Sequence, residues 1–249
     1  MILALFLFSL AVFVPEAAAE RRVLDLTQEL SEETPVYPGG VPFQKEEVAG
    51  FETAGYLAHR LTLGEHTGTH VDAPAHFSQG AAAIADLSAE QLVAPGVVIA
   101  VEKKAAKDPD YALDRRQILN WEASHGGRLP AGAVVLVRTG WGNRWPDEAA
   151  YRNADEQGVM HFPGVSPEAA ELLAKRGAAG VGIDTLSIDP GISTDFQAHK
   201  ALAAAGILVI ENLAGLEALP DSGFTLVVAP LKVQGGSGAP ARVLAILED

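Results

Sequence analysis

The segment EHTGTHVDAPAHF (65–77) places three of the chain's seven histidines and one aspartate within eleven residues. These side chains are His66, His70, Asp72 and His76. Imidazole and carboxylate groups bind Zn²⁺, Mn²⁺ and Fe²⁺, and the small residues between them let the backbone approach an ion closely. A histidine-rich loop with scattered hydrogen bonds is the alternative, but four such groups together favour a metal site.

The spacing also constrains the local backbone. Alternate residues of an extended chain point to one face, so His70 and Asp72 share a side and lie about 7 Å apart at their Cα atoms. A straight strand would carry the first and last histidines of the segment roughly 33 Å apart. The segment must therefore curve, and Gly68 and Pro74 offer places for it to do so. The same two residues argue against a helix, and so against the HExxH arrangement of zinc proteases.

Charge and composition narrow the class of protein. The chain has 249 residues, with 32 acidic against 18 basic side chains and a formal net charge of −14. Nucleic acids and anionic membranes bind clustered Lys and Arg, so this balance argues against both as partners. Because the chain has no cysteine, any metal site must use His, Asp and Glu. One or two divalent ions, Zn²⁺ or Mn²⁺, fit such ligands better than soft ions do.

The first 20 residues, MILALFLFSLAVFVPEAAAE, have the composition of an export signal. An apolar run is followed by small residues ahead of a charged stretch, which is typical of a cleaved signal peptide. The run is short for a membrane span of about 20 residues; an uncleaved anchor is the alternative. We predict a signal peptide over residues 1–19, cleavage after Ala19, and export to the periplasm or medium without stable membrane association. Residues 20–249 then form one domain.

Short runs rich in Val, Ile and Leu recur through this domain and predict β-strands. They lie at 22–27, 58–64, 96–102, 133–140, 177–184, 206–212, 224–233 and 241–248. Helical patterns lie between several of these runs, at 88–93, 113–125, 166–177 and 193–206. The predicted strands outnumber the helices and do not alternate strictly with them. The pattern predicts a single α/β domain with a mixed, curved, partly antiparallel sheet flanked by helices.

The segment HTGTHVDAPAHF (66–77) resembles the signature H-x-G-T-H-x-D-x-P-x-H-F of the bacterial kynurenine formamidase/putative cyclase family, and every fixed position is met. The likeness runs from LDLTQELSEETPVYPGG (24–40) to APLKVQGGSGAPARVLA (229–245), most of the chain after the predicted signal. It implies a cyclase-like fold of the swivelling β/β/α type. It also implies a metal-dependent hydrolase that acts on the carbon–nitrogen bond of an amide; isatin hydrolases are among the family's members.

The resemblance assigns roles to residues in two distant parts of the sequence. The implied metal ligands are His66, His70, Asp72, His199 and Glu211. Asp72 and Glu211 would bridge two ions where the site holds two. His76, the last histidine of the signature, would be the proton donor and acceptor. The local sequence independently supports the ligand role of Glu211. This residue follows the apolar run GILVI, where a buried carboxylate needs a counter-charge. An exposed strand end is the alternative.

The implied reaction is metal-assisted hydrolysis. A divalent ion activates water and polarises the amide carbonyl, while His76 takes the proton of the water and gives it to the departing nitrogen. We expect arylformamidase-like hydrolysis of an aryl amide, N-formyl-kynurenine to kynurenine and formate, a step of tryptophan catabolism. Ring opening of the cyclic amide of isatin is the second candidate. A secreted metal- or ligand-binding protein without turnover is a hypothesis of another class. Family members are dimers or tetramers, which implies a homodimer or homotetramer here.

Two features depart from the formamidase pattern. Tyr37 stands where formamidases usually carry a tryptophan that lines the substrate pocket, so we expect it to contact substrate with a smaller ring and a hydroxyl. The predicted export signal fits poorly with tryptophan breakdown, which is normally intracellular.

Other residues are weaker candidates. Asp184 and Thr185 are candidates for orienting a ligand histidine, with ordinary turn chemistry as the alternative. Trp141 and Trp145 are candidates for a lid over an aromatic substrate, or for a surface loop anchored by one indole. His161 is a candidate substrate contact.

Overall fold

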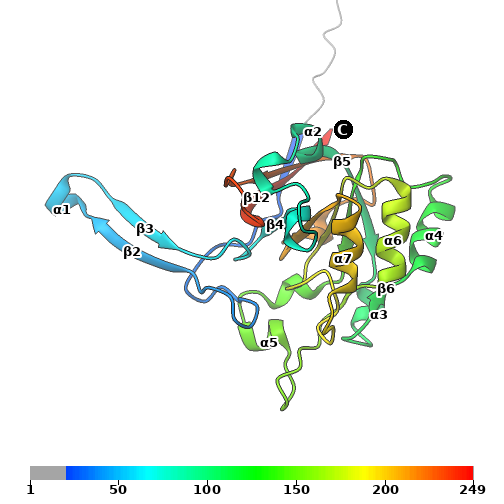
Figure 1. Cartoon of the computed structure of the whole chain (residues 1–249), viewed down its shortest axis with the longest axis horizontal. Helices are drawn as coiled ribbons and strands as arrows, with labels where there is room; N and C mark the ends of the chain where they lie inside the picture. Colours follow the sequence, from blue (N-terminus) through cyan, green and yellow to red (C-terminus); the bar gives the residue numbers. More distant parts are fainter. Residues whose placement is uncertain (1–20, 249) are drawn as a thin grey trace, which may run out of the picture.

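The computed structural model describes residues 21–248, so the predicted signal peptide over residues 1–19 lies outside the described part of the chain and stays a prediction. The described residues form a mixed α/β fold (Figure 1). Its main sheet has eight strands in the order β1-β12-β11-β5-β7-β9-β10-β4. Their bounds are β1 (Arg21–Asp25), β4 (His70–Asp72), β5 (Val93–Ala100), β7 (Val134–Arg138), β9 (Gly180–Ile183), β10 (Leu208–Glu211), β11 (Phe224–Pro230) and β12 (Gly238–Glu248). Between residues 21 and 248, no helix has both the length and the apolar character to cross a membrane.

Strand β12 closes this sheet into a ring. Its residues 241–247 pair with β11, and its first residues, 238–240, pair with β4 at the far end of the strand order. Strands β5, β7, β9 and β10 run parallel to one another. The other pairings, which involve β1, β4, β11 and β12, are antiparallel. The predicted single domain with a mixed, curved, partly antiparallel sheet is confirmed.

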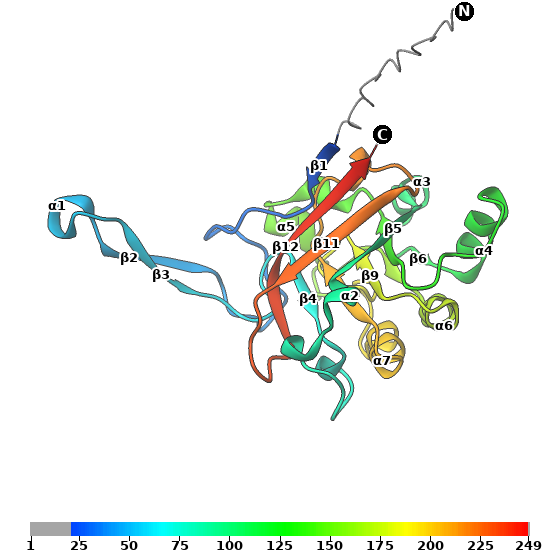
Figure 2. The same ribbon diagram turned by 90° about the horizontal axis from the view of Figure 1, so that it is seen from above.

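Three helices cover one face of the sheet. They are α4 (Arg115–Ser124), α6 (Pro167–Arg176) and α7 (Gln197–Ala204), and they lie side by side in both views (Figures 1 and 2). Val97 and Ile99 of β5 belong to the core that includes residues of these helices, whereas Val98 belongs to a second core on the other face. Both faces of the central strands are therefore covered, which explains their continuous apolar runs.

The remaining elements are short. They are β6 (Ala112–Leu113), β8 (Gly164–Val165), α2 (Ala89–Leu92), α3 (Glu102–Ala105), α5 (Glu148–Arg152), η1 (Pro74–His76), η2 (Ile84–Asp86), η3 (Trp141–Arg144) and η4 (Leu216–Ala218), where η marks a 3₁₀ turn. Of these, η1 matters most for the site, because it continues the histidine-rich segment directly after β4.

The ends of α6 agree with those predicted from the sequence, whereas the start of α7 differs from its prediction. In α6, the Ser166 hydroxyl accepts the Ala169 amide, and Gly177 ends the helix with a positive φ of 73°, as the Ser-Pro start and terminal Gly indicate. The prediction that a helix begins near Ser193 is wrong: α7 begins at Gln197. The carboxylate of Asp189, outside the helical pattern, accepts the amides at the start of α7, and this contact fixes where the helix begins.

A hairpin arm extends away from the body of the molecule. It consists of β2 (Gln44–Ala49), α1 (Phe51–Ala54) and β3 (Ala58–Thr62), and both views show it standing clear of the main sheet (Figures 1 and 2). Within residues 21–248, its two strands pair only with each other, although an isolated two-stranded hairpin is at best marginally stable in water. Sequence patterns predict the strand at 58–64 but do not reveal that it leaves the domain.

We expect Gly182→Ala to destabilise the protein by about 1–3 kcal/mol through overpacking. A Cβ atom on Gly182 would lie 2.7 Å from Leu136 Cδ2 and 2.8 Å from Leu213 Cδ1, in the middle of the sheet. Gly127→Ala is the matched control, because no atom of the described residues lies within 4 Å of a Cβ atom there. Urea unfolding of both variants measures the difference, and equal stabilities would contradict this account of the packing around β9.

Candidate metal centre

Adjacent antiparallel strands bring three of the predicted ligands together. In the register of β4 and β10, Glu211 lies opposite His70. His70 Nε2 lies 3.4 Å from Glu211 Oε2 and 3.2 Å from Asp72 Oδ1. All three side chains are buried. The two strands thus place two carboxylates around one imidazole, from positions about 140 residues apart in the sequence.

Helix α7 adds the fourth group from the other side. His199 Nε2 lies 3.1 Å from Asp72 Oδ2 and 3.1 Å from Glu211 Oε1. Its Nδ1 lies 2.6 Å from Asp189 Oδ2, so the ring is held with Nε2 toward the two carboxylates. The Ile188 amide donates to Glu211 Oε1 at 2.7 Å and fixes that carboxylate in turn.

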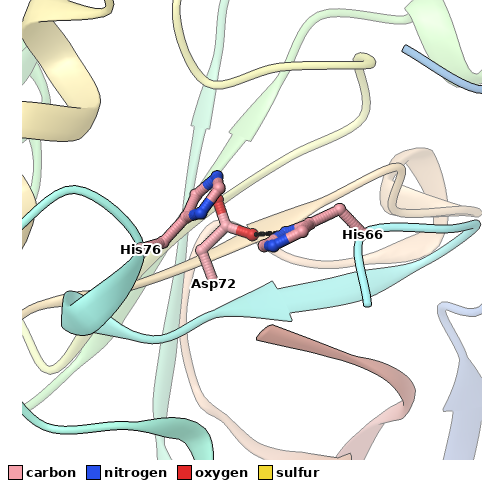
Figure 3. Close-up of side chains that lie close together, drawn as sticks. All are labelled: His66, Asp72 and His76. Carbon is pink, nitrogen blue, oxygen red and sulfur yellow. Dashed lines mark hydrogen bonds and ion pairs between the residues drawn. The ribbon is translucent and has the colours of Figure 1, made fainter. Parts of the chain in front are cut away.

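The two remaining histidines of the signature lie on the open side of Asp72. His66 Nδ1 is 2.6 Å from Asp72 Oδ1, and the ring of His76 stacks on that of His66 with centroids 4.0 Å apart. Figure 3 shows these three side chains together, with a dashed line joining the Asp72 carboxylate to His66. The chain curves as predicted: Gly68 has a positive φ of 68°, and Pro74 opens η1, which carries His76 back toward the cluster.

The donor set fits a divalent cation. Burial raises the pKa of the Asp72 carboxyl, but hydrogen bonds from three histidines outweigh burial and hold this pKa well below its usual range. The pKa of Glu211 is also lowered: burial and the charge of Asp72 raise it, and the bonds from His199 and His70 more than offset them. Two ionised carboxylates are therefore buried side by side, which requires neighbouring positive charge.

Ligand atoms within this cluster form two groups that share Asp72. One is His66, Asp72 and His76, the other is His70, Asp72 and Glu211, and within each group the atoms lie within 4.8 Å of one another. All five predicted ligands and His76 thus meet in one place. Their coordination of an ion stays a prediction.

Sequence analysis did not predict three residues that orient the candidate ligands and the backbone beside them. Asp189 holds His199. Asn212, directly after Glu211, donates from Nδ2 to the Gly68 carbonyl, and the Tyr151 hydroxyl donates to Asn212 Oδ1. The available signal for Asp189 was a carboxylate ten residues before His199 and followed by Pro-Gly.

The weaker candidates have other partners. The prediction that Asp184 orients a ligand histidine is wrong: its carboxylate accepts the Thr139 hydroxyl and the amides of Thr139 and Gly140. Thr185 donates to the Ser187 carbonyl instead. Trp141 is buried and donates from Nε1 to the Tyr151 carbonyl, which agrees with the alternative of a loop anchored by one indole.

A cavity of about 360 Å³ opens above the carboxylate–histidine cluster. Tyr37 lines it together with Phe77, Leu186 and Phe196, and the contact of Tyr37 with substrate stays a prediction. His161 does not line this cavity; its Nδ1 lies 2.9 Å from Asp110 Oδ1. The cavity therefore has a charged floor and largely aromatic walls, a combination suited to a small planar ligand with a polar end.

Comparison with known proteins agrees with this geometry. The model of the family described as "Putative cyclase" matches residues 24–190, and the chain belongs to this family, as the histidine signature indicated. It is similar to an isatin hydrolase of Roseibium aggregatum, with 36% identity over 92% of this chain and 93% of the relative. It is also similar to a kynurenine formamidase of Polaromonas naphthalenivorans, with 30% identity over 94% and 96% of the two chains.

Solved structures show the same fold. An isatin hydrolase bound to the product analogue thioisatinate superposes with a TM-score of 0.87 and 34% identity, over 92% of this chain and 94% of the other. The predicted cyclase-like fold is therefore confirmed.

We expect the affinity for Mn²⁺ or Zn²⁺ to rise with pH. Burial lowers the pKa of His70, but the bonds to Asp72 and Glu211 and their charges raise it to about 10 in the metal-free protein. This protonated imidazole stabilises the metal-free fold fully below the usual histidine pKa of 6.5, and that stabilisation is lost as the pH rises through about 10. An ion must displace the proton, so affinity should rise about tenfold per pH unit for each proton released.

Calorimetric titration at about pH 6 and about pH 8, in buffers of different ionisation enthalpy, measures both the affinity and the protons released. An affinity that is constant over this range, with no proton release, would contradict the charge balance described above.

Proposed function

We propose that the chain is a metal-dependent hydrolase of an aryl amide. The observation that carries the proposal is the pair of buried, ionised carboxylates, Asp72 and Glu211, bridged by two imidazoles on the floor of an aromatic-walled cavity. Family membership and the names of the relatives support the same class of reaction.

Two aryl amides, isatin and N-formyl-kynurenine, are the candidate substrates. Ring opening of the cyclic amide of isatin is favoured by the higher identity to the isatin hydrolase, 36% against 30% for the formamidase. Hydrolysis of N-formyl-kynurenine, the first expectation from the sequence, agrees with the formamidase relatives. Both substrates are aryl amides with a flat aromatic ring, and the cavity beside Tyr37 has aromatic walls that can contact such a ring.

The proposed ligands are His66, His70, Asp72, His199 and Glu211. A divalent ion held there would polarise the amide carbonyl and lower the pKa of water. Around it, the protein fixes the imidazoles: Asp189 holds Nδ1 of His199, and Nδ1 of His70 bonds to the Gly68 carbonyl at 2.9 Å. Each ring therefore presents Nε2 to the carboxylates, as metal-binding histidines usually require.

His76 is the proposed proton carrier. Partial burial lowers the pKa of its imidazole, so the ring is neutral near neutral pH and can accept a proton from the attacking water. It then gives this proton to the departing amide nitrogen, which leaves as the amine. No protein nucleophile takes part in this scheme.

We expect His76→Ala to lower kcat by about 10²- to 10⁴-fold while leaving the metal content unchanged. The measurement is turnover of isatin and N-formyl-kynurenine, with metal analysis by mass spectrometry on the same samples. His59→Ala, an exposed histidine on the arm, is the control. Loss of an ion from His76→Ala would make His76 a ligand, as its place in the group with His66 and Asp72 allows. A loaded wild-type protein that turns over neither substrate would favour a binding protein.

We also propose that the chain assembles as a homodimer or homotetramer through the hairpin arm. The arm exposes five large apolar side chains, with exposed fractions of 50–69%. They are Val48, Phe51, Tyr56, Leu57 and Leu61. So many apolar groups on a two-stranded hairpin that stands clear of its own domain mark an association surface, and a second copy presents a matching arm by symmetry.

We expect the double variant Phe51→Glu with Leu61→Glu to be monomeric under conditions where the wild type is a dimer or tetramer. Two charges placed in an apolar interface remain unpaired and buried, which disfavours association. Light scattering coupled to size-exclusion chromatography gives the mass. Leu119→Glu, an exposed leucine on α4, is the control. A wild-type monomer, or a variant of unchanged mass, would refute the role of the arm.

A further inference from the structure

Phe196 and Asn212, two residues beside the metal centre, have a left-handed backbone conformation that residues other than glycine rarely adopt. Between residues 21 and 248, the non-glycine residues with positive φ are Asn153, Phe196 and Asn212. Asparagine tolerates the left-handed region because its short side chain can hydrogen-bond locally. A bulky phenylalanine does not have this compensation, so Phe196, at φ 53° and ψ 46°, is held in a strained conformation by its surroundings.

The surroundings fix Phe196 on both sides. Its amide donates to the Ser193 hydroxyl at 3.2 Å, and the amides two and three residues later donate to the Asp189 carboxylate at 2.9 and 3.1 Å. Phe196 is thus the single residue between a loop and the first turn of α7. The left-handed turn at this point lets the chain enter the helix while the phenyl ring lines the cavity above the carboxylates.

The ring stands in the middle of the aromatic wall. Its centroid lies 6.1 Å from that of Tyr37, 5.5 Å from that of Phe77 and 6.0 Å from that of His199. Aromatic pairs are favourable at centroid separations of about 4.5–7 Å in tilted or edge-on arrangements. A planar ring in the cavity can therefore contact Phe196 while a carbonyl at its other end faces the floor.

We propose that Phe196 is a specificity-determining residue that selects aromatic over saturated rings in the substrate. The proposal rests on the proposed aryl amide hydrolysis and adds the residue that recognises the aryl ring of the substrate. The strained backbone is the cost of placing that ring at the cavity, because a residue free to choose its conformation would turn the side chain elsewhere.

The test compares two ligands with the same number of heavy atoms on the metal-loaded protein. Phenylglyoxylate has a flat aromatic ring, whereas cyclohexylglyoxylate has a puckered saturated ring. Calorimetry gives their dissociation constants, and the kcat/KM values for formanilide and N-cyclohexylformamide give the matching ratio in turnover. We expect wild type to prefer the phenyl member of each pair and Phe196→Ala to reduce this preference by roughly five- to tenfold.

A second variant separates recognition from folding. Phe196→Gly also removes the ring, but glycine adopts the left-handed conformation without strain. We expect Phe196→Gly to lose the phenyl preference to the same extent as Phe196→Ala. We also expect Phe196→Gly to melt at a higher temperature than Phe196→Ala. Ile192→Ala, an exposed residue of the same loop that does not line the cavity, should leave the preference unchanged.

The outcomes distinguish this inference from the proposed function. An unchanged phenyl preference in both Phe196 variants, or the absence of any preference in wild type, overturns the role of Phe196 even if the amides are hydrolysed. If wild type hydrolyses no amide but binds phenylglyoxylate selectively, and Phe196→Ala abolishes that selectivity, the proposed reaction fails and the role of Phe196 stands.

Discussion

The mutual repulsion of Asp72 and Glu211 is the constraint on which the rest of the structure depends. Both carboxylates are buried and share the same two imidazole neighbours. Two negative charges in a low-dielectric interior are tolerated only where fixed donors and cations surround them. The fold supplies these from three directions: His70 on β4, His199 on a covering helix, and the Ile188 amide in a loop. Each of these must be held in place, which explains the number of buried hydrogen bonds around the cluster.

The backbone achieves this with ordinary devices. The antiparallel register of β4 and β10 sets Glu211 opposite His70, and the ring closure by β12 protects β4 on its other edge. Asp189 has two functions, since its carboxylate accepts the first amides of α7 and orients the His199 imidazole in the same geometry. Helix start and imidazole orientation are therefore coupled, and neither can shift without the other.

The sequence predicted most of this site because its ligands are concentrated in a short signature whose parity and turn residues restrict the backbone. The apolar runs predicted a mixed sheet, since burial on both faces leaves a clear pattern. The start of α7 was misplaced because its cap, Asp189, precedes the loop and is not part of the helical pattern. Phe196 was missed for a related reason: a positive φ at a bulky residue depends on tertiary contacts and leaves no trace in local composition. One strand of the arm was predicted, but sequence patterns do not indicate whether a strand joins the main sheet.

The double pairing of β12 has a consequence for the order in which the molecule is completed. β12 follows every other element in the chain, yet its first residues flank β4, and the backbone at Gly238 passes so close to His66 that a Cβ atom there would lie 2.5 Å from the imidazole. During synthesis, the histidine-rich segment emerges from the ribosome long before the strand that packs beside it. The wall behind His66 is therefore completed only after β12 itself has been synthesised.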